Sequence, residues 1–133
     1  MGHPAVKHGD QVTAVDIHIV MVPSPSGSVP TPLPHPFVGM FDGNLSSNVK
    51  IMGQAAATLG STASNQPPHI PTPPGVSFQI PPTNKATIMA GSSSVLINGK
   101  PAARVGDQVQ TCGDPAPNMS GTIIAVGTVL IGG

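Results

Sequence analysis

The sequence is poor in aromatic and charged residues. Of its 133 residues only 2% are aromatic, and tryptophan and tyrosine are absent, which excludes a large aromatic core. Charged residues make up 8% of the chain, against about a quarter of an ordinary soluble protein. The formal net charge is zero and the few lysines and arginines are scattered. Nucleic acid and an anionic membrane surface are therefore disfavoured as partners.

Cysteine and long apolar runs are also scarce. The single cysteine, Cys112, excludes an internal disulfide framework. The first residues contain neither the apolar segment of a signal peptide nor a myristoylation motif, and the apolar run at residues 19–22 is far too short to span a membrane. We expect a protein made in the cytoplasm that leaves, if it does, without a signal peptide.

Glycine and proline are abundant instead, with 16 and 17 residues. They interrupt nearly every ten-residue window, which argues against helix over most of the chain. Runs rich in valine and isoleucine, together with the low charge, argue against disorder. We therefore predict one all-β domain over residues 1–133. Its core is small, and small cores often need a metal, a disulfide or a partner subunit for stability.

Three imperfect internal repeats organise the chain. Residues 48–65 align without a gap with residues 94–111, and residues 1–12 align with residues 98–109. The end of the chain, "TVLIGG", resembles "SVLING" and adds a truncated fourth piece. The predicted repeats cover roughly residues 1–20, 47–70 and 93–133.

Each repeat is typical of short strands joined by tight turns. "SVLING" ends in Asn98-Gly99, which is the strongest short signal for a β-hairpin. Gly106-Asp107 predicts the next turn, and "QVQT" after it predicts another strand. Two proline-rich segments, residues 22–39 and 65–82, separate the repeats and are predicted to be long loops.

The histidines and Cys112 are the candidate metal ligands. In the repeat alignment His18 and His69 occupy equivalent positions, and Cys112 lies three residues before the third such position. Repeats around a pseudo-threefold axis would bring these three side chains together, and His35, held between prolines, is a candidate fourth ligand. Three imidazoles and one thiolate form a common closed set for tetrahedral Zn²⁺, and a closed set indicates a structural metal.

Other interpretations of these residues stay open. His3 and His8 fall at positions expected to be solvated or beside a turn, and either is an alternative to one of the assigned ligands. Cys112 is also compatible with a buried free thiol that packs as a small apolar residue. The chain has only five acidic residues. No Ser/His/Asp arrangement, pair of carboxylates or phosphate-binding glycine loop stands out in the sequence, so an enzyme is not expected.

The stretch "INGKPAARVGD", residues 97–107, contains the Pro-Ala-Ala-Arg sequence and resembles the PAAR-repeat family. "GHPAVKHGD" and "MGQAAATLGS" are degenerate copies of the same unit, so the resemblance covers essentially the whole chain. It implies a small pointed cone of short strands with pseudo-threefold repeats and long proline-rich loops. The second repeat departs from the pattern, because Ser61 replaces the aspartate and Thr58 the arginine.

The resemblance also implies a function. Members cap the trimeric spike of a contractile injection machine, either a type VI secretion system or a phage tail-like extracellular injection particle. They typically hold one metal near the vertex with three histidines and one cysteine. On this chain the implied ligands are His18, His35, His69 and Cys112, and the metal is zinc, with iron as the alternative.

We therefore expect a non-enzymatic, metal-stabilised tip that sharpens the spike and helps to pierce a target membrane. One pseudo-threefold chain on a threefold spike implies one copy per spike. The particle would deliver it outside the producing cell or into a target cell. Two alternatives are an adaptor that docks effector cargo onto the spike and a small zinc hydrolase, which would need an open coordination position.

Overall fold

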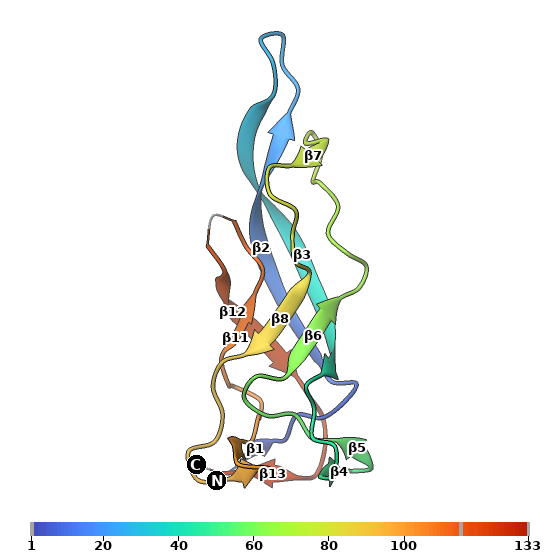
Figure 1. Ribbon diagram of the computed structural model, residues 1–133, viewed down its shortest axis with the longest axis vertical. Coiled ribbons are helices and arrows are strands. Elements are labelled where there is room, and N and C mark those ends of the chain that lie inside the picture. The colour runs from blue at the N-terminus through green and yellow to red at the C-terminus, as the bar shows by residue number, and fades with distance from the viewer. Residues whose placement is uncertain (1, 115, 133) are drawn as a thin grey trace.

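The computed structural model describes residues 2–114 and 116–132, and this part of the chain is all-β, as predicted. It contains no helix long and apolar enough to cross a membrane. Figure 1 shows a molecule that narrows from a broad base, where β1, β4, β5 and β13 lie, to a single hairpin formed by β2 and β3 at the far end.

The strands of the described residues have the following bounds: β1 (His3–Pro4), β2 (Gln11–Val22), β3 (Val29–Gly43), β4 (Lys50–Ile51), β5 (Gln54–Ala55), β6 (Thr62–Asn65), β7 (Ser77–Phe78), β8 (Lys85–Ile88), β9 (Leu96–Ile97), β10 (Lys100–Pro101), β11 (Val109–Thr111), β12 (Asn118–Ile124) and β13 (Leu130–Ile131).

The main sheet closes into a small antiparallel barrel. Its strand order is β12-β11-β8-β6-β3-β2-β7, and β12 also pairs with the start of β2. Closure leaves these strands without free edges over the lower part of the molecule. Alternate residues of each strand point inward, and the buried apolar cluster inside the barrel includes Val12, Phe37, Phe41, Ile88 and Val109.

The first proline-rich segment is not a loop, and this prediction was wrong over residues 29–39. These residues belong to β3, the longest strand, which pairs with β2 along its whole length. The expectation of short strands was therefore wrong for β2 and β3. Beyond the barrel the two strands form a projecting ribbon (Figure 1).

The spacing of the prolines explains how this strand forms. They occupy every second position of β3, at residues 30, 32, 34 and 36. Alternate residues of a strand direct their N–H groups to opposite sides, and Val38, in the same alternation, donates its N–H away from β2 to the Asn65 side chain, at 2.9 Å. The backbone N–H groups that the prolines lack would thus have pointed away from β2, so the pairing of β3 with β2 loses no donor. The prolines also protect the outer edge of the ribbon from further pairing.

The second proline-rich segment lies largely outside strands. Residues 66–76 and 79–84 are irregular, and between them the two residues of β7 pair with the outer part of β2. The segment therefore returns along the β2–β3 ribbon before the chain enters the barrel again at β8.

Three small two-stranded units form the base. β9 and β10 make the predicted hairpin, with Asn98 and Gly99 at positive φ values of 54° and 79°. β4 and β5 make a second hairpin, and β13 pairs with β1 to make the third unit. The segment interpreted as a truncated fourth piece is thus the partner strand of β1 at the other end of the chain.

A closed ring of backbone hydrogen bonds joins the three aligned segments. Val6 donates to Ala103 at 3.1 Å, Ala103 donates to Ala57 at 3.1 Å, and Ala57 donates to Val6 at 2.9 Å. These residues are completely buried, and their small side chains permit the close approach of the three backbones. A second buried cluster lies beside the ring, and its members also come in threes: Ala5, Ala56 and Ala102 with Ile51, Ile97 and Ile131.

The three turns that follow the ring share one geometry. Each contains a glycine at positive φ, with 91° at Gly9, 91° at Gly60 and 99° at Gly106. The next side chain accepts a hydrogen bond from the backbone N–H three residues earlier: Asp10 from Lys7, Ser61 from Thr58 and Asp107 from Arg104. Ser61 thus takes the role that aspartate has in the other two turns.

Alanine at each of these glycines should destabilise the protein by similar amounts. No neighbouring atom lies within 4 Å of the added Cβ in any of the three turns, so the cost comes from the left-handed backbone, at about 1–2 kcal/mol each. Urea denaturation of Gly9→Ala, Gly60→Ala and Gly106→Ala measures these changes in unfolding free energy. A variant as stable as the wild type would contradict the expectation for that turn.

Candidate metal centre

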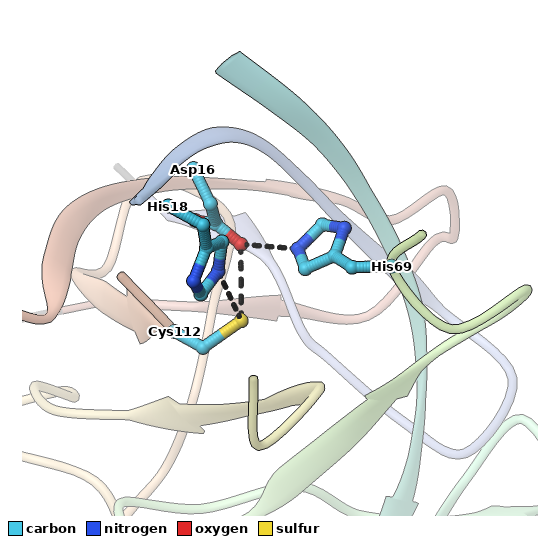
Figure 2. Close-up of side chains that lie close together, drawn as sticks. All are labelled: Asp16, His18, His69 and Cys112. Carbon is cyan, nitrogen blue, oxygen red and sulfur yellow. Dashed lines mark hydrogen bonds and ion pairs between the residues drawn. The ribbon is translucent and has the colours of Figure 1, made fainter. Parts of the chain in front are cut away.

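Four buried side chains meet next to the apolar core of the barrel, to which Cys112 also belongs: Asp16, His18, His69 and Cys112. One possible ligand atom from each lies within 4.8 Å of all the others. Figure 2 shows the carboxylate of Asp16 between the imidazole of His69 and the sulfur of Cys112, with His18 beside the sulfur. The cluster combines a carboxyl, two imidazoles and a thiol.

Three parts of the chain supply these residues. Asp16 and His18 are two positions apart on β2, so both point to the inner face that carries Val12 lower in the strand. Cys112 directly follows β11. His69 comes from the irregular segment at residues 66–76, where its backbone N–H donates to the Asn84 side chain at 2.8 Å.

Asp16 is the best-connected member of the cluster. Its Oδ2 accepts hydrogen bonds from His69 Nε2 at 2.9 Å and from Cys112 Sγ at 3.3 Å. Its Oδ1 accepts from the Thr111 hydroxyl and, at 3.2 Å, from the Asn118 amide. Burial by itself raises the pKa of Asp16, but the hydrogen bonds from His69, Thr111, Asn118 and Cys112 together hold this pKa below its ordinary value.

Burial dominates the protonation of Cys112 and His18. It raises the pKa of Cys112 to about 12, with a further contribution from the negative charge of Asp16. It lowers the pKa of His18, as does the neighbouring His69. The protein by itself therefore favours a neutral thiol and a neutral imidazole, with His18 Nε2 3.4 Å from Cys112 Sγ. A metal cation would reverse the preference of the thiol, because it stabilises the thiolate directly.

His35, the fourth ligand expected from the sequence, lies next to this cluster. It is buried in β3 directly opposite Asp16, and its ring centroid is 5.5 Å from those of both His18 and His69. Its Nδ1 donates to the Leu33 carbonyl at 2.9 Å, and its Nε2 accepts from the Thr72 backbone N–H at 3.1 Å. Both ring nitrogens thus contact the backbone, and ligation by His35 stays a prediction.

The structure brings together three of the four expected ligands, His18, His69 and Cys112, and leaves His3 and His8 exposed outside the cluster. The sequence reasoning missed Asp16. A signal was present, because Asp16 precedes His18 by two positions in a predicted strand and is the only charged residue between Gln11 and Phe41.

The donor set fits a metal ion. Carboxylate, imidazole and thiolate are all ordinary zinc ligands. In addition, His18 Nδ1 is buried without a hydrogen-bond partner within the described residues. A buried imidazole nitrogen without a partner is what a metal ligand would be in a structure that holds no ion. Two hollows flank the cluster, one of about 280 Å³ against His35 and His69 and one of about 420 Å³ against His18 and Cys112.

Comparison with known proteins gives a family. A sequence profile described as PAAR motif matches residues 21–117 and residues 79–133, which together cover most of the chain. No curated protein and no solved structure matches it.

Proposed function

Because the chain belongs to the PAAR motif family, we propose that it is a metal-stabilised tip that caps the trimeric spike of a contractile injection machine and helps to pierce the target membrane. Proteins of this family are structural spike-tip proteins rather than enzymes. The alternative function of a small zinc hydrolase is therefore excluded.

The distribution of charge along the molecule carries the proposal. We define the distal part as residues 14–38, 66–84, 112–114 and 116–120, which lie away from the base in Figure 1. Within the described residues, its only acidic or basic side chains apart from the three buried histidines are Asp16 and Asp114, and both are buried. The remaining lysines, arginine and aspartates belong to the base and the barrel strands, with Lys85 at the border, in the same hollow as His18 and Cys112. Since each exposed charge costs about 2.5–3.5 kcal/mol at the centre of a bilayer, the distal part is the one suited to enter a membrane.

The outer face of the β2–β3 ribbon is apolar as well. Val15 and Ile17 of β2 are 61% and 44% exposed, and they lie opposite Pro36 and Pro34 of β3. The prolines leave no backbone donors at alternate positions of this edge, which lowers the number of polar groups that a bilayer would have to accommodate. A narrow, uncharged ribbon thus leads the molecule.

The base suits a threefold partner. The ring through Val6, Ala57 and Ala103 is cyclic, and the three two-stranded units surround it. Leu96 and Leu130, at corresponding positions of two of these units, are 61% and 59% exposed. We propose that this face meets the end of the trimeric spike, so that one chain covers three equivalent subunits.

The buried cluster would give the tip its rigidity. A metal ion held by Cys112, His18 and His69 would supply a cross-link between β2, the irregular segment and the end of β11. Of these parts, the end of β11 also joins the apolar cluster of the barrel, through Cys112. We propose zinc as the ion, with iron as the alternative, and His35 as the fourth donor.

Two double variants separate docking from piercing. Leu96→Asp with Leu130→Asp should reduce co-purification of the chain with its spike by about tenfold or more, since about 1.4 kcal/mol of lost affinity suffices. Val15→Asp with Ile17→Asp should dock normally but reduce delivery by the assembled particle by about tenfold or more. Each pair is the control for the other. Normal docking of the base variant, or normal delivery by the ribbon variant, would contradict the corresponding part of the proposal.

The adaptor role expected as the alternative makes a different prediction. It requires that effector proteins remain bound to the chain on purified particles. Mass spectrometry of particles with and without the chain distinguishes the two roles. If the chain is an adaptor, particles without it also lack the effector proteins; if it is only a tip, their other protein components are unchanged.

A further inference from the structure

We propose that the distal part binds lipid by itself: it enters the apolar interior of a bilayer with two opposite faces in contact with acyl chains, whatever the charge of the headgroups. The inference rests on the proposed piercing role and goes beyond it, because a tip pushed by the machine needs no affinity of its own for lipid. It is carried by the placement of exposed apolar side chains, by the pairing of the ribbon backbone and by the lack of exposed charge.

Exposed apolar side chains lie on opposite faces of the distal part. Val15 and Ile17 point outward from β2, because Asp16 between them points into the buried cluster. Ile70 and Ile80 belong to the chain that covers the other side of β2, and each lines one of the two hollows beside the cluster. Ile70 is 77% exposed, the highest value among these four. Among the described residues, the other large apolar side chains exposed on the distal part are Val29, Val38, Val76 and Met119.

This placement favours lipid over a protein as the occupant. An exposed apolar patch on one face marks a site for a partner that docks there. A partner docked over Val15 and Ile17 would leave Ile70 and Ile80 in water. The interior of a bilayer surrounds whatever enters it, so it covers the apolar side chains of both faces at once.

The backbone of the ribbon is paired where it would meet hydrocarbon. Along the edge of β2 that faces away from β3, the carbonyls of residues 15, 17, 19 and 21 each accept a hydrogen bond of 2.8 to 3.0 Å. At the apex, Ser24 and Gly27 donate to each other's carbonyls at 3.0 and 3.1 Å. Unpaired backbone groups are strongly disfavoured in hydrocarbon, where no water replaces the missing partner. The donors to β2 are, in order, the Asn118 side chain and the backbone N–H groups of Asp114, Gln79 and Val76.

The ribbon is long enough to reach deep into a bilayer without carrying an exposed charge. From residue 15 to residue 22, β2 extends about 26 Å at about 3.3 Å per residue, which exceeds half of a hydrocarbon layer about 30 Å thick. Asp16 and Asp114 are buried, so the described residues of the distal part present no charged group to the headgroups. We therefore expect binding that depends on apolar contact and not on lipid charge.

Flotation of the purified full chain with vesicles tests the affinity. We expect the wild type to bind vesicles of zwitterionic phosphatidylcholine, and to bind vesicles with about a quarter of anionic phosphatidylglycerol with an affinity within about threefold of that value. Binding to the anionic vesicles alone overturns the proposal, because it would show attraction by headgroup charge. A wild type that binds neither kind overturns it too but leaves a tip driven by the machine intact, since docking and delivery by particles test that role separately.

Variants on the two faces test whether lipid contacts both. Ile70→Asp with Ile80→Asp should weaken binding to phosphatidylcholine vesicles by about tenfold or more, as should the ribbon variant. The base variant makes the same kind of change at exposed leucines outside the distal part, so it is the matched control and should bind like the wild type. Loss of binding in the base variant, or in only one of the two distal variants, overturns the proposal.

Tryptophan fluorescence locates the contacts directly. Because the chain has no tryptophan, a single substitution gives an unambiguous signal, and Val15→Trp, Ile70→Trp and Leu96→Trp place it on the two distal faces and at the base. We expect phosphatidylcholine with brominated acyl chains to quench the first two variants and not the third. Quenching at only one distal face, or at the base, overturns the proposal.

Discussion

Removal of the metal from the purified protein is expected to lower its unfolding temperature by about 10 °C or more. Structural zinc sites contribute their binding free energy to folding, and a loss of 1 kcal/mol lowers the unfolding temperature of a domain of this size by about 4 °C. Even a few kcal/mol from the ion would therefore give a shift of this size. Calorimetry before and after treatment with a chelator, followed by readdition of zinc, measures it.

Cys112→Ser is the matched variant for this experiment. Serine retains the shape of the side chain but not the thiolate, so the variant should unfold near the temperature of the metal-free wild type and should respond little to the chelator. Equal unfolding temperatures of the metal-loaded and metal-free wild type would show that the ion does not stabilise the tip.

The packing around the cluster explains why the effect should be large. The ring centroid of Phe78 lies 5.6 Å from that of His18 and 5.2 Å from that of His35, while Phe37 lies 5.9 Å from His69. The imidazoles thus occupy places that apolar side chains fill lower in the barrel. Polar side chains gain less from burial than the apolar ones lower in the barrel, so an ion that joins them adds stability that packing alone does not supply.

Phe41→Ala should cost about 3–5 kcal/mol of unfolding free energy, the range for deletion of a buried phenylalanine. The Phe41 side chain is fully buried in the apolar cluster of the barrel. The chain has only three phenylalanines and no tryptophan or tyrosine, so few other large side chains are at hand to fill the cavity. Urea denaturation at equilibrium measures the change.

Val38→Ala is the control for Phe41→Ala, because Val38 lies on the same strand but is 41% exposed. Its substitution should change the stability by no more than about 0.5 kcal/mol. Similar losses in the two variants would mean that the barrel interior is not the main apolar core. The Phe41 variant should still bind the metal when folded, since Phe41 lies outside the cluster of ligands.

Local features of the fold followed from the sequence. Asn98-Gly99 forms the predicted hairpin turn because positive φ is tolerated by these residue types. "GQAAATLG", residues 53–60, is strand and turn rather than helix, as its alignment with residues 99–106 indicated. The all-β class followed in the same way, since glycine and proline act on the backbone within a few residues of their own position.

The candidate site was predictable only in part. The repeat alignment grouped His18, His69 and Cys112, which the structure places together. It contained no aspartate at a corresponding position, so it gave no reason to consider Asp16. His35 was interpreted as a loop residue because prolines flank it on both sides, whereas the structure places it in a strand.

The sequence by itself thus determined the residue types, the turns and the repeat spacing, because these depend on short-range sterics and hydrogen bonding. Only the tertiary structure decided that prolines at alternate positions make a strand, because the outcome depends on which side of β3 carries the partner strand. It also decided that β13 completes the unit begun by β1, and that Asp16 faces His69 and Cys112. The contacts of β13 with β1 and of Asp16 with His69 and Cys112 join residues more than 50 positions apart, and such pairs meet only in the folded chain.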